Sequence, residues 1–231
     1  MALDEALLES VAVGSAGPTL RLYGWRPRAV SIGYSQILND SVDPYMCRKH
    51  GVDVVRRMTG GGTVFHDREL TYSVVTSERV VPRGVQESFE FICEGIVAGL
   101  KRLGVEAGIS SSNDIIVGGA KVSGNAQLRR RGHILQHGSV FLNLDQGTMS
   151  DLLIEDGKGN KGGICMPEGR VICLKDLGVN LSFQEVSKRI SRGFETALGL
   201  RLREDEPTEK EIERRDVLSR KKYETAAWNE R

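Results

Sequence analysis

Residues 114–144 read DIIVGGAKVSGNAQLRRRGHILQHGSVFLNL. The β-branched and apolar runs in this stretch are interrupted twice, by Gly118-Gly119 and by the basic turn RRRG at residues 129–132. Two glycines between strand-like runs are typical of a two-residue hairpin turn, because glycine adopts the positive φ angles that this turn requires. The stretch therefore predicts three consecutive antiparallel strands joined by tight turns.

More strands and several helices surround this meander. Runs rich in β-branched and aromatic residues predict four further strands, at residues 19–25, 29–34, 52–58 and 70–76. Apolar residues at helical spacing predict helices at residues 1–11, 86–103 and 182–198. Capping boxes start at Ser182 and at Thr208, which opens a last helix. We expect a single α+β domain over residues 1–231, within broader α/β usage, with helices flanking a mixed, largely antiparallel sheet.

The composition limits the partners that this chain can bind. It has 231 residues, 39% of them hydrophobic, and its 32 basic residues nearly balance 31 acidic ones, which gives a net charge of +1. Such a surface does not attract nucleic acid as a whole, and the apolar runs are too short to cross a bilayer. The start MALDEALLES is acidic where a secretory signal is basic. We expect a cytoplasmic protein that binds neither nucleic acid nor membranes.

The four cysteines lack a CxxC pair and fit neither a disulfide framework nor a zinc site. Cys93 lies among apolar residues at helical spacing and is expected in the core. Cys165 differs because it follows the glycine-rich run KGNKGGIC. That run belongs to residues 154–170, a weakly patterned stretch that we expect to form a mobile loop.

The stretch RRMTGGGTVFHD, residues 56–67, contains more glycine than a turn requires. Successive glycines let backbone N–H groups converge on an anion or a carbonyl oxygen, and Arg56 or Arg57 can add a bidentate contact to phosphate. No Lys-Ser or Lys-Thr follows the glycines and no GxGxxG turn opens a helix, so the common nucleotide-binding loops are excluded. A purely structural bulge between Met58 and Val64 is the alternative.

A second group of polar residues belongs to the meander. Lys121 lies three residues before Gly124 in a strand of otherwise small residues, so its cation can reach over a neighbouring cavity. Asn113 and Asp114 stand at the start of the preceding strand, and the hairpin brings them near Lys121. Taken alone, a lysine in a strand is more often a solvated surface group, and His137 is more often a sheet histidine than a catalyst.

Together these motifs resemble one family. RRMTGGGTVFHD is similar to the RRxxGGGxVxHD signature of lipoate-protein ligases. KVSGNAQ followed by ILQHGSVFLNLD is similar to their KxxGxA lysine motif and HGS strand. The segments MALDEAL, LRLYGWRPRAVSIGYSQ and KKYETAAWN also resemble the catalytic domain of this family. The resemblance runs nearly end to end and implies the biotin/lipoate ligase fold.

The resemblance implies an ATP-dependent lipoate-protein ligase. Such an enzyme activates lipoate with ATP and Mg²⁺ to lipoyl-AMP and transfers the lipoyl group to a lipoyl-carrier domain, as in a 2-oxoacid dehydrogenase E2 or the glycine cleavage H protein. Lys121 would be the catalytic cation, which offsets anion repulsion and stabilises the oxyanion of amide formation. Asp114 would be a candidate Mg²⁺ ligand. The residues implied to bind substrate or lipoyl-AMP are Arg56, Gly60, Gly61, Gly62, Thr63, Val64, His66, Asn113, Asp114, Gly124, Ala126, His137 and Gly138.

The resemblance also bears on the end of the sequence. Many family members carry a small accessory domain after the Tyr-Trp-Asn segment, whereas this sequence stops at Arg231. We expect a catalytic domain without the accessory domain, with a separate accessory subunit as a candidate partner. Tyr223 and Trp228, two aromatic residues in a polar tail, are either a docking site for that partner or anchors of the tail.

An octanoyl or lipoyl transferase of the same fold is the alternative, because it needs no ATP and carries the acyl group as a cysteine thioester. In one transferase class the cysteine lies upstream of the lysine motif, where this chain reads GISSSND and has no cysteine. Cys165 and Cys173, farther downstream, keep the transferase open. Two other classes are disfavoured: a noncatalytic lipoyl-domain binding protein by the presence of Lys121, and a biotin ligase by the lack of a GRGRxGR-type loop.

Overall fold

The predicted meander is present in the computed structural model and forms the middle of the larger of two sheets. Strand β7 (Asp114–Val117) turns at Gly118 and Gly119, whose φ angles are 56° and 82°, into β8 (Ala120–Arg130). A second turn, at Arg131 (φ 53°) and Gly132 (φ 76°), leads into β9 (His133–Phe141). Both turns carry two left-handed residues, which matches the twist of antiparallel strands.

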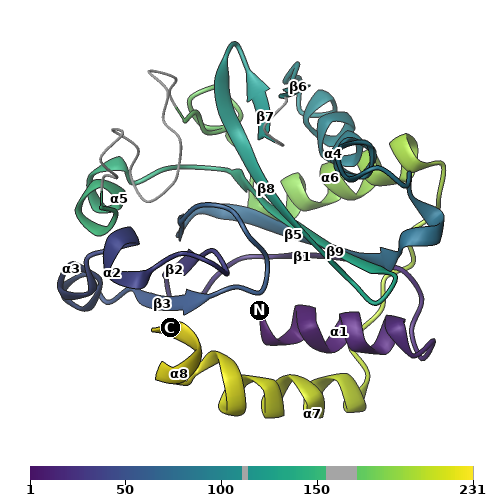
Figure 1. Ribbon diagram of the computed structural model, residues 1–231. Coiled ribbons are helices and arrows are strands. Elements are labelled where there is room, and N and C mark those ends of the chain that lie inside the picture. Colours follow the sequence, from purple (N-terminus) through teal and green to yellow (C-terminus); the bar gives the residue numbers. More distant parts are fainter. Residues whose placement is uncertain (111–113, 155–170, 231) are drawn as a thin grey trace.

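The structure describes residues 1–110, 114–154 and 171–230. In this part of the chain the meander extends to six strands in the order β1-β5-β9-β8-β7-β6, and every neighbouring pair is antiparallel. The three strands that extend the meander are β1 (Thr19–Tyr23), β5 (Glu69–Ser77) and β6 (Gly108–Ile109). This sheet is the scaffold on which the helices pack (Figure 1).

A smaller sheet of three strands lies beside the first one (Figure 1). It consists of β3 (Asp53–Arg56), β2 (Ala29–Ile32) and β4 (Val64–His66), with β2 parallel to β3 and antiparallel to β4. Its core is formed with three short helices, α2 (Leu38–Ser41), α3 (Pro44–Lys49) and α5 (Gln146–Leu152). The predicted mixed, largely antiparallel α+β fold is confirmed, and among the described strands the parallel pair belongs to the smaller sheet.

Two helices cover one face of the larger sheet, as the sequence predicts. Helices α4 (Val85–Lys101) and α6 (Phe183–Leu198) pack against each other, and their apolar side chains join those of the sheet in the largest core cluster (Figure 1). Helix α6 begins with the predicted capping box of Ser182 and Glu185 and ends at Gly199, whose φ of 62° suits a left-handed C-cap. A 3₁₀ turn, Glu78–Val80, precedes α4.

The opposite face of the sheet is covered by the N-terminal helix α1 (Ala2–Ala12), which buries Leu7 and Leu8 against Val75 and Leu135. Helix α7 (Glu209–Leu218) starts at the predicted capping box and packs on α1 (Figure 1). A π-helical turn, Ser219–Tyr223, and the short helix α8 (Ala226–Asn229) then bring the end of the chain beside β3. Residues far apart in sequence therefore meet at β3.

The sequence analysis predicted that no segment crosses a membrane and that residues 154–170 form a loop. Within the described ranges, no helix is long and apolar enough to cross a bilayer. The loop predicted for residues 154–170 lies outside the described residues, apart from Ile154.

Gly193 allows the close approach of α4 and α6 and gives a test of the packing. A Cβ atom at Gly193 would lie 2.3 Å from the backbone nitrogen of Gly99 and 2.4 Å from the carbonyl oxygen of Gly95. We predict that Gly193→Ala lowers the free energy of unfolding by about 1–3 kcal/mol through overpacking, although alanine is intrinsically favoured over glycine in a helix by about 1 kcal/mol.

Urea denaturation of the variant measures this effect. Gly147→Ala in α5 is the matched control, because its Cβ would find its nearest neighbour at an ordinary 3.6 Å. The control should be neutral or slightly stabilised. An unchanged or raised stability of Gly193→Ala would contradict the packing argument.

Candidate active site

A cavity of about 90 Å³ is lined by residues of both sheets. Ser31 and His66 contribute from the smaller sheet, and Thr71, Lys121 and His137 contribute from the larger one. The predicted site residues that line it are Gly61, Gly62, Thr63, Val64, His66, Lys121, Gly124, Ala126, His137 and Gly138. The two motifs recognised in the sequence thus face one cavity.

Lys121 reaches this cavity across Gly124. A Cβ atom at Gly124 would lie 2.7 Å from Cε and 2.8 Å from Nζ of Lys121, so any larger residue there would displace the end of the lysine side chain. The ammonium forms an ion pair with Asp114, whose Oδ1 lies 2.8 Å from Nζ. Asn113, predicted beside Asp114, lies outside the described residues.

Arg56 does not line the cavity, contrary to its predicted contact with substrate. The side chain is fully buried, and its guanidinium donates hydrogen bonds to the carbonyl oxygens of Gly33 (3.0 Å), Trp228 (3.0 Å) and Asn229 (2.9 Å), among others. These acceptors come from the loop after β2 and from the C-terminal segment. Arg56 therefore joins two parts of the protein. Gly60, also predicted in the site, is not among the cavity residues either.

Arg57 is the arginine that faces the cavity. Its guanidinium donates to the carbonyl oxygens of Gly60 (2.8 Å), Gly62 (2.6 Å) and Ser31 (3.1 Å). Burial lowers its pKa to about 10, so the group stays protonated at neutral pH. The glycine run is thus shaped by carbonyl groups that turn toward a cation, whereas the sequence suggested N–H groups that turn toward an anion or a carbonyl oxygen.

His66 belongs to a hydrogen-bonded chain in the cavity wall. Its Nδ1 lies 2.7 Å from Oε1 of Glu69, and its Nε2 lies 2.8 Å from the hydroxyl of Ser31. The indole of Trp25 stacks on the imidazole at 4.0 Å between ring centroids and donates to the hydroxyl of Thr71. With Glu69 accepting from Nδ1, Nε2 accepts from Ser31, which fixes both the tautomer and the ring orientation.

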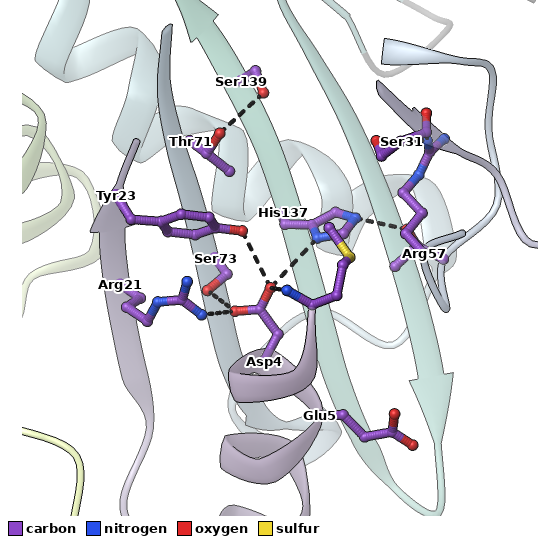
Figure 2. Close-up of polar contacts among 12 residues, drawn as sticks. Asp4, Glu5, Arg21, Tyr23, Ser31, Arg57, Thr71, Ser73, His137 and Ser139 are labelled. Atoms are coloured by element: carbon purple, nitrogen blue, oxygen red, sulfur yellow. Dashed lines mark hydrogen bonds and ion pairs between the residues drawn. The ribbon is translucent and has the colours of Figure 1, made fainter. Parts of the chain in front are cut away.

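His137 is buried on the other wall, and Figure 2 shows its imidazole facing Asp4. Its Nε2 lies 2.6 Å from the hydroxyl of Thr59, and its Nδ1 lies 3.9 Å from Oδ2 of Asp4. The second distance is too long for a hydrogen bond but short enough for attraction to an imidazolium. Asp4 also pairs with Arg21 and accepts from Ser73 at 2.8 Å. The N-terminal helix therefore supplies a buried anion to the site.

Several of these residues were missed by the sequence analysis. Asp4, Trp25, Ser31, Glu69 and Thr71 are single polar or aromatic residues in helices, strands and loops, with no local motif of their own. A usable signal existed for Asp4, because an acidic residue on the apolar side of a helix needs a buried partner.

The aromatic residues of the C-terminal tail anchor it to the core. Tyr223 is buried and donates to Glu5 at 2.7 Å, and Trp228 donates from its indole to the carbonyl oxygen of Arg56 at 2.8 Å. Of the two hypotheses for this pair, the structure favours the anchor over an exposed docking site.

Three cysteines lie in the described residues, and all three are buried. Burial raises the pKa of the Cys47 thiol to about 11 and that of Cys93 to about 12. Burial and the neighbouring Asp176 also raise the pKa of Cys173. Since the thiolate is the nucleophile, none of the three is poised for attack. Cys165 lies outside the described residues.

The α+β fold has two sheets, and Lys121 extends past Gly124 to a cavity lined by Gly61 and Gly62 of the glycine run. These features define a catalytic domain of the biotin/lipoate ligase superfamily. The model of the lipoyl protein ligase A/B catalytic domain matches residues 1–195. The chain belongs to this family.

Relatives and solved structures show which members this chain is similar to. It is 38% identical to the octanoyltransferase LipM of Symbiobacterium thermophilum over 100% of this chain and 93% of the relative. It is 36% identical to the octanoyltransferase LipM of Anoxybacillus flavithermus over 99% of this chain and 92% of the relative. It also superimposes on a bi-partite lipoate protein ligase from Thermoplasma acidophilum with a TM-score of 0.85 at 33% identity, over 99% of this chain and 89% of the other.

These findings correct the predicted activity. The two LipM relatives match the whole chain and are octanoyltransferases, so the prediction of an ATP-dependent lipoate-protein ligase is wrong and the alternative is better supported. ATP and Mg²⁺ lose their support as cofactors. Among the described residues, no three His, Cys, Asp or Glu side chains are grouped so as to hold a metal ion. The prediction of a lipoate-pathway protein is confirmed by the family.

The two buried histidines predict acid sensitivity. Burial lowers the pKa of His66 and of His137 below 6.5, although Glu69 and Asp4 respectively oppose the shift. In each case the unfolded chain takes up the proton first as pH falls. The stabilising contribution is therefore complete above about pH 6.5 and is lost below it.

We predict that the free energy of unfolding falls by about 1 kcal/mol or more between pH 7.5 and pH 5. Urea denaturation at a series of pH values measures this change. His66→Gln and His137→Gln should each flatten the profile, whatever their effect on stability at pH 7.5. A wild-type profile that is flat over this range would contradict the assignment of neutral imidazoles.

Proposed function

We propose that this protein is an acyltransferase that moves an octanoyl or lipoyl group from a thioester donor to a lysine of a lipoyl-carrier domain, without ATP. The observation that carries the proposal is the match to octanoyltransferases over the whole chain. A thioester is already activated, so a transferase must only bind the acyl chain, polarise the carbonyl and exclude water.

The charges of the cavity suit this chemistry. Attack on a thioester carbonyl creates an oxyanion, and preorganised cations or N–H donors in a partly dry site stabilise that charge best. Lys121 lines the cavity with a side chain that is 23% exposed, and Arg57 lies buried in the glycine wall. In our proposal Lys121 faces the reacting carbonyl, and Arg57 holds the wall that keeps the acyl group in place.

A second cavity, of about 30 Å³, suits the acyl chain. It shares Val64, Lys121, Gly124 and Ser139 with the first cavity, so the two spaces adjoin at the lysine. Its other walls are apolar and are formed by Phe65, Phe141, Leu144, Met149 and Val171. With its carbonyl at Lys121, a medium-length acyl chain could place part of its methylene groups against these walls, at roughly 0.8 kcal/mol for each group buried.

The proposed acceptor is a lipoyl-carrier domain. The solved structure of the Thermoplasma acidophilum ligase is described together with its E2 lipoyl domain, which supports an acceptor of that kind here. Three further points stay predictions: the choice between an E2 domain and a glycine cleavage H protein, the separate accessory subunit, and the cytoplasmic location.

The first test measures nucleotide dependence and the role of Lys121. Octanoyl-loaded carrier protein and an apo lipoyl domain are mixed with the enzyme, and acylation is followed by intact mass with and without Mg-ATP. We predict transfer without ATP and no gain on its addition. Lys121→Ala should lower the rate about 100- to 1000-fold, because it removes one preorganised charge contact.

Lys175→Ala is the matched control, since Lys175 is an exposed lysine that does not line either cavity. It should keep the wild-type rate. Acylation that occurs only from free acid plus ATP would overturn the proposed function, and a normal rate for Lys121→Ala would remove Lys121 from the site.

The second test concerns the thiol on which the acyl group would rest. Burial and raised pKa values disfavour Cys47, Cys93 and Cys173 as nucleophiles, so we assign the proposed thioester to Cys165. We predict that serine at Cys165 abolishes transfer and the mass adduct on the enzyme, whereas serine at each of the other three leaves both in place. Full activity of Cys165→Ser would show direct transfer from donor to acceptor.

A further inference from the structure

We propose that Asp114 is a positioning residue, which holds the Lys121 ammonium over Gly124 at the junction of the two cavities. This inference rests on the proposed acyl transfer and assigns Asp114 a role other than metal or nucleotide binding. It follows from an irregularity in the β7–β8 hairpin, from the contact between the two side chains, and from the backbone contacts of Val171 and Ile172 with Lys121.

The irregularity decides where Lys121 points. Residues three apart in a regular strand face opposite sides, so Lys121 and Gly124 should not meet. The register between β7 and β8 shifts, however: Ile115 pairs with Ser123, and Ile116 pairs with Lys121. Val122 is thus an extra residue, and such a bulge re-aims the neighbouring side chain. The observed contact of Lys121 with Gly124 is the consequence.

The carboxylate of Asp114 lies beside the ammonium group of Lys121. Asp114 pairs with Gly124 across the hairpin, and its Oδ1 accepts from Lys121 Nζ at 2.8 Å. The two side chains are 24% and 23% exposed, so water screens this pair less than it would on an open surface. A free lysine side chain populates many rotamers, and the carboxylate selects those that place the ammonium at the cavity mouth.

The backbone of Lys121 is held independently of Asp114. Its carbonyl oxygen accepts a hydrogen bond from Ile172 at 2.9 Å, and it forms an isolated parallel bridge with Val171. Val122, beside it, is fully buried in the core. Removing the carboxylate should therefore leave the bulge in place and release only the side chain. The expected loss is in catalytic rate, with the acyl-binding walls unchanged.

A double-mutant cycle tests this role in the acyl-transfer assay described above, with the variants Asp114→Asn, Lys121→Ala and both together. We expect Asp114→Asn to lower kcat about 10- to 100-fold, the range for a hydrogen bond to a charged group, with little change in the KM for the acyl donor. In the Lys121→Ala background the same substitution should have no further effect, because Asp114 acts through the lysine.

An equal loss in both backgrounds would show that Asp114 acts on the substrate or a metal and would overturn the proposal. Asp205→Asn is the control, since Asp205 also pairs with a basic residue, Arg203 at 3.4 Å, but is exposed and remote from the cavity. It should leave kcat unchanged. Gly124→Ala, which crowds Lys121 without removing the carboxylate, should also lower kcat.

A spectroscopic readout separates this inference from the proposed function. In protein labelled with ¹³C at lysine, the Lys121 ε signal is assigned by its loss in Lys121→Ala, with no acyl substrate present. We expect two inequivalent ε protons in the wild type and one averaged signal in Asp114→Asn. Averaged protons in the wild type would overturn the positioning role even if transfer occurs, and inequivalent protons would support it even if the proposed transfer fails.

Discussion

The buried guanidinium of Arg56 is the constraint on which the arrangement of the site depends. A charge without solvent costs several kcal/mol unless every donor finds an acceptor. Here the acceptors are main-chain carbonyl oxygens of Gly33, Tyr34, Gln36, Trp228 and Asn229. Side chains of the C-terminal segment also bind the backbone of Arg56. The side chain of Asn229 accepts a hydrogen bond from the Arg56 amide, and the indole of Trp228 donates one to the Arg56 carbonyl oxygen. Helix α8 is thereby tied to β3, an edge strand of the smaller sheet.

This tie fixes the glycine wall of the cavity through one close contact. A Cβ atom at Gly33 would lie 2.0 Å from the carbonyl oxygen of Gly61, so the loop held by Arg56 lies directly on the glycine run. The neighbouring residue, Arg57, turns to the other side and grips Gly60 and Gly62 from the cavity. Two consecutive arginines thus act on opposite sides of the backbone, as alternating side chains in extended chain do. One joins the tail to the loop, and the other shapes the wall.

Features encoded locally could be predicted from the sequence, and features that depend on distant contacts could not. The meander, helices α4 and α6 and both capping boxes follow from periodicity and turn chemistry within short segments. The division into two sheets depends on pairings between strands such as β1 and β5, which no local pattern specifies. Arg56 was misassigned for the same reason: its partners at the C-terminus lie 172 and 173 residues away. Asp114 was placed correctly beside Lys121, but the bulge that joins them leaves no signature in the sequence.

The mistaken prediction of ATP dependence has a physical origin. In the proposed function the glycine run and the lysine motif would bind an acyl group and stabilise an oxyanion, and both tasks are the same whether the leaving group is a nucleotide or a thiol. The cavity here has cations at Arg57 and Lys121, and in the proposed function the Lys121 ammonium would stabilise the oxyanion of a tetrahedral acyl intermediate. Motifs that describe this intermediate identify the family, but they carry no information about the group that departs from it.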